Sequence, residues 1–269
     1  MFFDSHVHSS FSLDSKLNPE KACKKAIALG LSGIAFTDHL DYDYPGYDDA
    51  FNIDFEKYLK YFSHLGNAYK DKLIISKGIE VGIQPHVISK TMDLLNKYQF
   101  DFMIGSVHII DRQDPYIGEY YKGKEKKEAY TRYLEEILFM LDNFNKFDVL
   151  GHIDYITRYS CYDDRSLYYN DHTDLIDCIY KNLINQGKGI EINTSSYRDK
   201  AGIKTCVYDI KLLKRYKELG GTIITLGSDA HSEEYIGYKF DYFKDMLLQA
   251  GFDYTAYFIG RKPKFIKLQ

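Results

Sequence analysis

Short apolar runs that end in a metal-ligand side chain recur along this sequence. The first run leads into His6-Val7-His8, and five later runs end at Asp38-His39, Glu80, His108, His152 and Asp229-Ala230-His231. Side chains at positions i and i+2 of a strand point to the same face, so His6 and His8 can reach one ion. The carboxyl ends of strands in a parallel barrel meet at one face. The pattern therefore predicts a ring of nitrogen and oxygen ligands at one end of a barrel.

Segments with helix-spaced apolar residues alternate with these runs. The first begins at the cap signal Asn18-Pro19-Glu20 and ends at Gly30, and the others span residues 54–70, 85–98, 124–145, 171–186, 207–219 and 241–250. Strands that alternate with helices indicate a parallel sheet. Seven such units without a linker between them favour an α/β fold closed into one barrel, a single domain over residues 1–269.

Composition excludes several classes of protein. Hydrophobic residues make up 45% of the 269 residues, which is enough for a large core and argues against disorder. The formal net charge of −4 argues against a generally basic surface for nucleic acid. A local basic pocket for a small phosphorylated substrate remains compatible with this charge.

The four cysteines show no C-x-x-C pair and no short framework spacing, which excludes a thiolate zinc site and favours a reduced protein. The sequence has no signal-peptide pattern and no apolar run of membrane-spanning length. We therefore expect a cytoplasmic protein with no membrane partner. The sequence does not indicate an oligomeric state.

The number of candidate ligands exceeds the need of one tetrahedral zinc ion. Imidazole and carboxylate donors without thiolates suit two or three divalent ions such as Zn²⁺, Mn²⁺ or Fe. Such a cluster activates water and holds the attacking and leaving oxygens of a phosphoryl displacement. Three other histidines, His64, His86 and His172, follow no strand end and are expected to be structural.

The motifs together resemble one known family. The H-x-H at 6–8, Thr-Asp-His at 37–39, Gly-Ile-Glu at 78–80, Gly-Ser-Val-His at 105–108, Gly-His at 151–152 and Ser-Asp-Ala-His at 228–231 look like the PHP (polymerase and histidinol phosphatase) family. The likeness runs from Asp4 to His231, with the motifs in family order. It implies a distorted (β/α)7, TIM-like barrel with a trinuclear metal site.

The resemblance also implies a ligand set. It places His6, His8, Glu80 and Asp229 around one ion, Glu80 again with His108 and His152 around a second, and Asp14, His39 and His231 around a third. Asp14 lies in the loop after the first strand, where many relatives have histidine. A solvated loop carboxylate is the alternative interpretation of Asp14.

Two arginines also follow predicted strand ends. Arg158 and Arg198 would lie over the barrel mouth, where a planar guanidinium suits the non-bridging oxygens of a phosphoryl group. Surface arginines are the alternative interpretation. By hypothesis, activated water attacks phosphorus in line, and Asp229 or His231 handles the proton of the nucleophile or of the leaving alkoxide.

The resemblance is strongest to the histidinol-phosphatase branch, through the Ile-Gly-Ser-Val-His and Gly-His-Ile-Asp motifs. It implies a hydrolase that converts L-histidinol phosphate to L-histidinol and phosphate in histidine biosynthesis. One alternative is a phosphoesterase of the same fold that acts on phosphotyrosine or nucleotides. A metal-binding module without turnover is the alternative from a different functional class.

Overall fold

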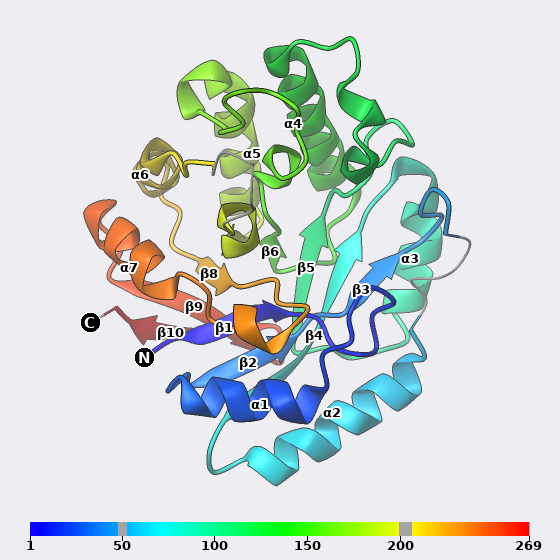
Figure 1. The fold of residues 1–269 in the computed structure, drawn as a ribbon, viewed down its shortest axis with the longest axis vertical. Helices are drawn as coiled ribbons and strands as arrows, with labels where there is room; N and C mark the ends of the chain where they lie inside the picture. The colour runs from blue at the N-terminus through cyan, green and yellow to red at the C-terminus, as the bar shows by residue number, and fades with distance from the viewer. Residues whose placement is uncertain (48–52, 199–205, 269) are drawn as a thin grey trace.

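A computed structural model describes residues 1–47, 53–198 and 206–268 of the chain. Its main sheet consists of parallel strands in the order β1-β2-β4-β5-β6-β7-β8, with β3 paired to β4. These strands are β1 (Phe3–Val7), β2 (Gly33–Phe36), β3 (His39–Asp41), β4 (Ile74–Gly82), β5 (Phe102–Ser106), β6 (Val149–Leu150), β7 (Gly189–Asn193) and β8 (Ile224–Gly227). The alternation of strands with helices in Figure 1 follows from the apolar runs in the sequence.

The sheet closes into a barrel between its first and last strands. Val7 forms a parallel bridge with Ala230. The amide of His8 donates to the carbonyl of Ala230 at 3.0 Å, and the amide of Asp229 donates to the carbonyl of His6 at 2.7 Å. The predicted distorted (β/α)7 barrel is therefore confirmed.

Strand β4 is long enough to pair with two successive strands. Its first half pairs with β2 and its second half with β3, so that His39 lies opposite Glu80. Between β2 and β3 the chain leaves the ladder at Thr37 and Asp38. This short break brings His39 over the barrel end, where Glu80 also lies.

The helices pack around the outside of the sheet, as Figure 1 shows. Within the described residues they are α1 (Pro19–Ala28), α2 (Phe55–Tyr69), α3 (Ile88–Leu95), α4 (Lys126–Asn143), α5 (Thr173–Asn185), α6 (Ile210–Glu218) and α7 (Phe240–Gln249). Each falls within a segment that the sequence predicts as helical, except that α7 begins one residue before its predicted start. The Asn18 side chain accepts hydrogen bonds from the amides of Glu20 and Lys21, so the predicted cap is present.

No described helix has the length and apolar character needed to cross a membrane. All four cysteines are free.

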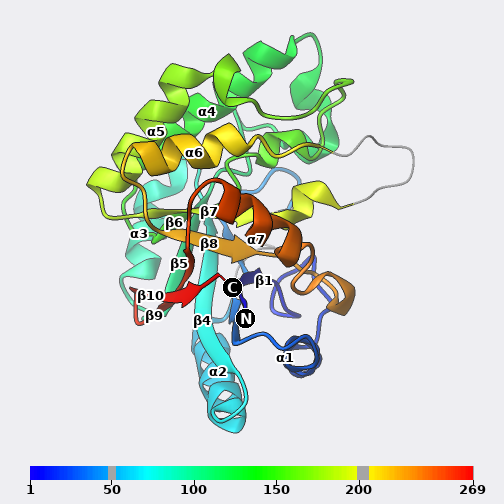
Figure 2. The ribbon, with the colours of Figure 1, turned by 90° about the vertical axis from the view of Figure 1, so that its left-hand side faces the viewer.

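A C-terminal hairpin was not predicted from the sequence. Strands β9 (Tyr254–Ile259) and β10 (Lys262–Lys267) pair antiparallel and lie beside the start of β8 (Figure 2). The ring of Phe258 stacks on Phe102 with centroids 5.1 Å apart, and Tyr257 stacks on Phe3 at 4.6 Å. The hairpin therefore completes a second apolar cluster at the amino-terminal end of the barrel, away from the predicted ligands.

Replacing Phe258 with alanine is expected to lower the free energy of unfolding by about 3–5 kcal/mol, because a buried aromatic ring is lost and a cavity remains. Phe258 is 4% exposed, whereas Phe265 on the partner strand is 51% exposed. Phe265→Ala is the matched control and should change stability little. Urea unfolding of both variants measures the difference, and equal effects would contradict the packing role.

Candidate metal centre

The predicted ligands gather at the carboxyl ends of the strands. A cavity of about 530 Å³ opens there, and its lining includes Asp14, His39, Glu80, His108, His152, Arg158, Arg198, Asp229 and His231. His6 and His8 are fully buried and contact Glu80 and Asp229. The structure thus brings together all eleven residues that the sequence singled out.

The first cluster joins β1 to β4 and to the end of β8. The Nε2 atoms of His6 and His8 lie 3.0 Å apart, and Glu80 Oε2 lies 3.2 Å from the former and 3.4 Å from the latter. Asp229 Oδ1 is 3.8 Å from His6 Nε2 and 3.2 Å from His8 Nε2. Ligand atoms about 2.1 Å from a tetrahedral zinc ion are roughly 3.4 Å from one another, so His6, His8 and Glu80 fit one ion, and Asp229 lies beside the two histidines as a candidate fourth donor.

The second cluster uses the other oxygen of Glu80. Oε1 lies 3.2 Å from His108 Nε2 and 2.8 Å from His152 Nε2, and the two nitrogens are 3.4 Å apart. These distances fit a second ion by the same criterion. Because its two oxygens face different clusters, Glu80 is placed as a bridge between them.

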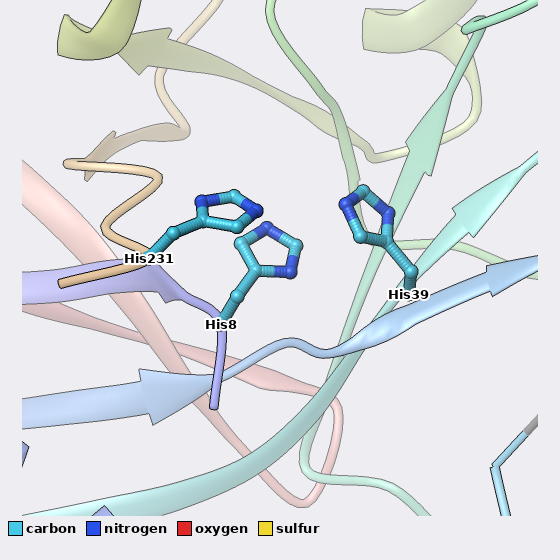
Figure 3. Close-up of side chains that lie close together, drawn as sticks. All are labelled: His8, His39 and His231. Carbon is cyan, nitrogen blue, oxygen red and sulfur yellow. The ribbon is translucent and has the colours of Figure 1, made fainter. Parts of the chain in front are cut away.

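The third cluster lies at the edge of the cavity. Asp14 Oδ2 is 3.1 Å from His231 Nε2 and 3.5 Å from His39 Nε2. Figure 3 shows the rings of His8, His39 and His231 close together, and the His8 ring centroid lies 4.2 Å from each of the other two. The loop carboxylate of Asp14 is therefore directed to the cluster rather than to solvent alone.

The ionisable groups of the clusters shift one another's pKa values. Burial raises the pKa of Glu80, but the imidazoles of His6 and His108 outweigh burial and bring this pKa well below its ordinary value. The pKa of Asp229 is likewise lowered, mainly by the Arg158 guanidinium acting against burial. Burial lowers the pKa of His8 to about 3, with further lowering by neighbouring histidines. For His6, His39 and His108, burial lowers the pKa but neighbouring carboxylates outweigh it, raising the pKa of His6 and His39 well above its ordinary value and that of His108 to about 9. The carboxylates are thus anionic, and binding of a cation would displace protons from these three imidazoles.

The sequence analysis missed two carboxylates, Glu191 and Asp41, that accept hydrogen bonds from the Nδ1 atoms of ligand histidines. His6 Nδ1 donates to Glu191 Oε1 at 2.6 Å, and His108 Nδ1 donates to Asp41 Oδ1 at 2.8 Å. Each bond keeps the proton on Nδ1 and leaves Nε2 free to bind an ion. A signal for Glu191 was present, since it is a charged residue in the middle of the apolar run Gly189–Asn193. Asp41 carried a weaker signal, its i+2 spacing from His39 on β3.

Glu191→Gln is expected to weaken zinc affinity and activity by about 10–100-fold, the usual cost of losing such a carboxylate behind a metal ligand. The glutamine retains the shape but holds the His6 ring less firmly and leaves its nitrogen less basic. Zinc titration and phosphatase assays measure the change. Glu56→Gln, on the exposed face of α2, is the control. Unchanged zinc affinity in Glu191→Gln would contradict this role.

The two arginines both reach the cavity. Arg158 Nη1 pairs with Asp229 Oδ2 at 2.8 Å, and its Nε donates to Ser196 Oγ at 3.0 Å. Its Nη2 is buried and has no hydrogen-bond partner among the described residues. Arg198 Nη2 donates to the carbonyls of Ser228 and Asp229 at 2.6 and 2.8 Å. The Nη2 group of Arg158 is thus an N–H donor without a partner in a residue beside the clusters, and such a donor is suited to bind an anion.

The three remaining histidines lie outside the clusters. His64 is exposed on α2, and His86 Nε2 lies 2.5 Å from Asp43 Oδ2. His172 Nδ1 is 3.3 Å from Thr131 Oγ1. Their positions agree with the structural roles expected of them.

Comparisons with known proteins agree with this geometry. The PHP domain family model matches residues 4–195. A histidinol-phosphatase of Lactococcus lactis is 36% identical over 260 residues, which cover 96% of this chain and 95% of the relative. A probable histidinol-phosphatase of Clostridium acetobutylicum is 37% identical over 240 residues, covering 89% and 90% of the two chains. A crystal structure of the Lactococcus lactis histidinol phosphate phosphatase, complexed with zinc, L-histidinol and phosphate, has a TM-score of 0.88 at 35% identity and covers 98% of both chains. With its motifs, its barrel and its relatives in agreement, this chain belongs to the PHP (polymerase and histidinol phosphatase) family.

Proposed function

We propose that this protein is a metal-dependent phosphomonoesterase that hydrolyses L-histidinol phosphate to L-histidinol and phosphate in histidine biosynthesis. The observation that carries the proposal is the buried, unpartnered Nη2 of Arg158, a residue that lines the same cavity as the metal-ligand clusters. The full-length likeness to histidinol-phosphatases supports the choice of substrate.

The residues present fit two or three divalent ions, with zinc, manganese and iron as the candidates. His6, His8, Glu80 and Asp229 would hold the first, and the sets Glu80, His108, His152 and Asp14, His39, His231 would hold the others. Ions bound there supply Lewis-acid polarisation of phosphoryl oxygens and activation of water. In this proposal Asp14 is a ligand rather than a solvated carboxylate.

Arg158 binds and orients the phosphoryl group. Its guanidinium is held by Asp229 and Ser196, so Nη2 is placed before substrate arrives and little reorganisation is needed. Arg198 is fixed by two backbone carbonyls and by its position over the Tyr235 ring, 4.1 Å from the centroid. Two positive groups thus face the equatorial oxygens from separate loops.

Asp229 and His231 are the two candidates for proton handling, and of these Asp229 lies beside Arg158, the residue proposed to bind the phosphoryl group. Burial raises the pKa of Asp229, but the Arg158 guanidinium outweighs burial and this pKa is lowered. The carboxylate is therefore ionised and can accept a hydrogen bond from attacking water. Both ring nitrogens of His231 are engaged, Nδ1 by the Asp229 carbonyl at 3.0 Å and Nε2 by Asp14 at 3.1 Å. His231 is therefore assigned to the third cluster.

The cavity suits a small cationic substrate. Its walls are aromatic, formed by Tyr44, Tyr47, Tyr116, Tyr155 and Tyr159. Asp114 also lines the cavity, and its Oδ2 accepts a hydrogen bond from the Tyr44 hydroxyl at 2.8 Å. A carboxylate among aromatic rings complements the ammonium and imidazole groups of histidinol phosphate.

The same proposal includes the domain boundaries and the cellular location of this protein. We assign residues 1–269 to one PHP-type barrel domain, since β1 and β8 close the barrel from opposite ends of the sequence. A cytoplasmic location fits the four free cysteines.

Phosphate release from histidinol phosphate, phosphotyrosine and a nucleoside 3′,5′-bisphosphate, assayed side by side with metal-replete protein, tests the function. We expect strong preference for histidinol phosphate. Preference for either of the others would contradict the assignment, and no release from any would favour a metal-binding module.

Arg158→Gln is expected to lower kcat/KM for histidinol phosphate by about 100–1000-fold, as loss of one preorganised donor to a developing anion does elsewhere. Metal content should stay close to that of the unchanged protein. Arg132→Gln removes an arginine that pairs with Asp111 outside the cavity and is the control. Near-native turnover in Arg158→Gln would rule out the phosphate-binding role.

A further inference from the structure

The loop between β1 and α1 places Asp14 without the help of regular secondary structure. Asp14 has the most exposed side chain of the nine candidate ligands, at 42%, yet its carboxylate lies within 3.5 Å of both His39 and His231. A ligand on an irregular loop needs another group to fix its position. The contacts of this loop identify that group.

Asp38 is the centre of these contacts. Its side chain is completely buried, at the break between β2 and β3. Oδ1 accepts hydrogen bonds from the Ser9 amide at 2.6 Å, the Ser12 amide at 3.1 Å and the Ser12 hydroxyl at 2.8 Å. Oδ2 accepts one from the Ser9 hydroxyl at 2.8 Å. One carboxylate therefore binds the loop at two positions.

The same contacts connect the loop to the strand that bears His39. The Ser12 hydroxyl accepts a hydrogen bond from the His39 amide at 3.0 Å. On the other side of Asp14, the Ser15 hydroxyl lies 3.3 Å from the carbonyls of both His8 and His231. Asp14 is thus held between two anchors, and the first of them depends on Asp38.

We propose that Asp38 is a positioning residue for the third metal ion, setting Asp14 and His39 at the separation that this ion requires. The inference rests on the proposed metal centre. Asp38 precedes His39 directly, so its hydrogen bonds to Ser9 and Ser12 fix loop and ligand strand relative to each other. The first two clusters draw their donors from strands and strand ends that the barrel itself positions. Their contact with this loop is through His8, whose Nδ1 lies 3.4 Å from the Ser12 hydroxyl.

The number of zinc ions bound at buffered free zinc concentrations tests the inference. Asp38→Ala should bind the third ion about 10–100-fold more weakly and weaken the other two much less. Asp38→Asn keeps the Oδ1 acceptor but presents an amide donor to Ser9, so it should weaken the same ion less. If Asp38→Ala does not fold, Asp38→Asn alone decides the question.

Two further variants sharpen the result. Asp14→Ala removes the ligand directly and should lose the same ion, and adding Asp38→Ala to it should cause no further loss, because both act on one site. Asp101→Asn is the matched control, since Asp101 accepts backbone hydrogen bonds from Lys77 and Gly260 at 3.1 and 3.0 Å beside the C-terminal hairpin. It should retain all three ions.

Unchanged affinity for all three ions in folded Asp38 variants would overturn the inference, as would equal weakening of all three. A protein that binds three ions and loses one in Asp38→Ala but releases no phosphate would support the inference while contradicting the proposed function. The two proposals therefore fail in distinguishable ways.

Discussion

Glu80→Gln is expected to lower kcat/KM for histidinol phosphate by about 1000-fold or more, the largest effect of any single substitution in this protein. The two oxygens of Glu80 face different clusters, and Oε1 and Oε2 lie within 3.4 Å of five imidazole nitrogens in all, one of which is His39 Nδ1 of the third cluster. An amide nitrogen at either position provides no lone pair for a cation. Loss of metal chemistry removes several kcal/mol of transition-state stabilisation, which corresponds to three or more decades in rate.

Metal analysis and kinetics on the same Glu80→Gln sample check this result. We expect fewer than two ions per chain and residual turnover near background. Glu136→Gln is the matched control, because Glu136 is also a buried glutamate, 7% exposed, but pairs with Arg132 on α4. A Glu80→Gln protein that retained full metal content and near-native turnover would disprove the bridging role.

Removal of the metal ions with a chelator is expected to abolish phosphate release and to lower Tm by about 10 °C. Ions present at about 1000 times their Kd contribute about 4 kcal/mol to the folded state, and each kcal/mol shifts Tm by about 2–4 °C in a chain of this size. Without the ions, the buried carboxylates of Glu80 and Asp229 lie beside imidazole lone pairs with no cation between them.

Thermal unfolding with and without chelator, followed by addition of zinc, provides the measurement. Zinc should restore both Tm and turnover. The Tm of Glu80→Gln should respond much less to zinc, which separates binding at this centre from binding elsewhere. A chelated protein with unchanged Tm and full turnover would contradict the metal requirement.

Much of the site could be predicted because its signals are local in sequence. Each strand is an apolar run followed directly by its ligand, so the position of His108 or His152 follows from the end of β5 or β6. The helices carry caps and spacing that are also local, as at Asn18. Membership in a parallel barrel then places all strand ends at one face.

The features that were missed depend on contacts between distant residues. Glu191 acts on His6, which is 185 positions away, and Asp41 acts on His108, 67 positions away. The hairpin β9–β10 is stable only through packing of rings such as Phe258 on the barrel. Asp14 lies on a loop without periodicity, and its place follows from the tertiary contacts of Asp38.

The closure of the barrel between β1 and β8 has a consequence for biosynthesis. His6 leaves the ribosome more than two hundred residues before Asp229, which completes the same cluster. Until β8 has emerged, the nascent chain contains the histidines of β1 without the contacts between β1 and β8 that position them. The complete first cluster therefore forms only late in synthesis, and binding of its ion indicates that the whole barrel has formed.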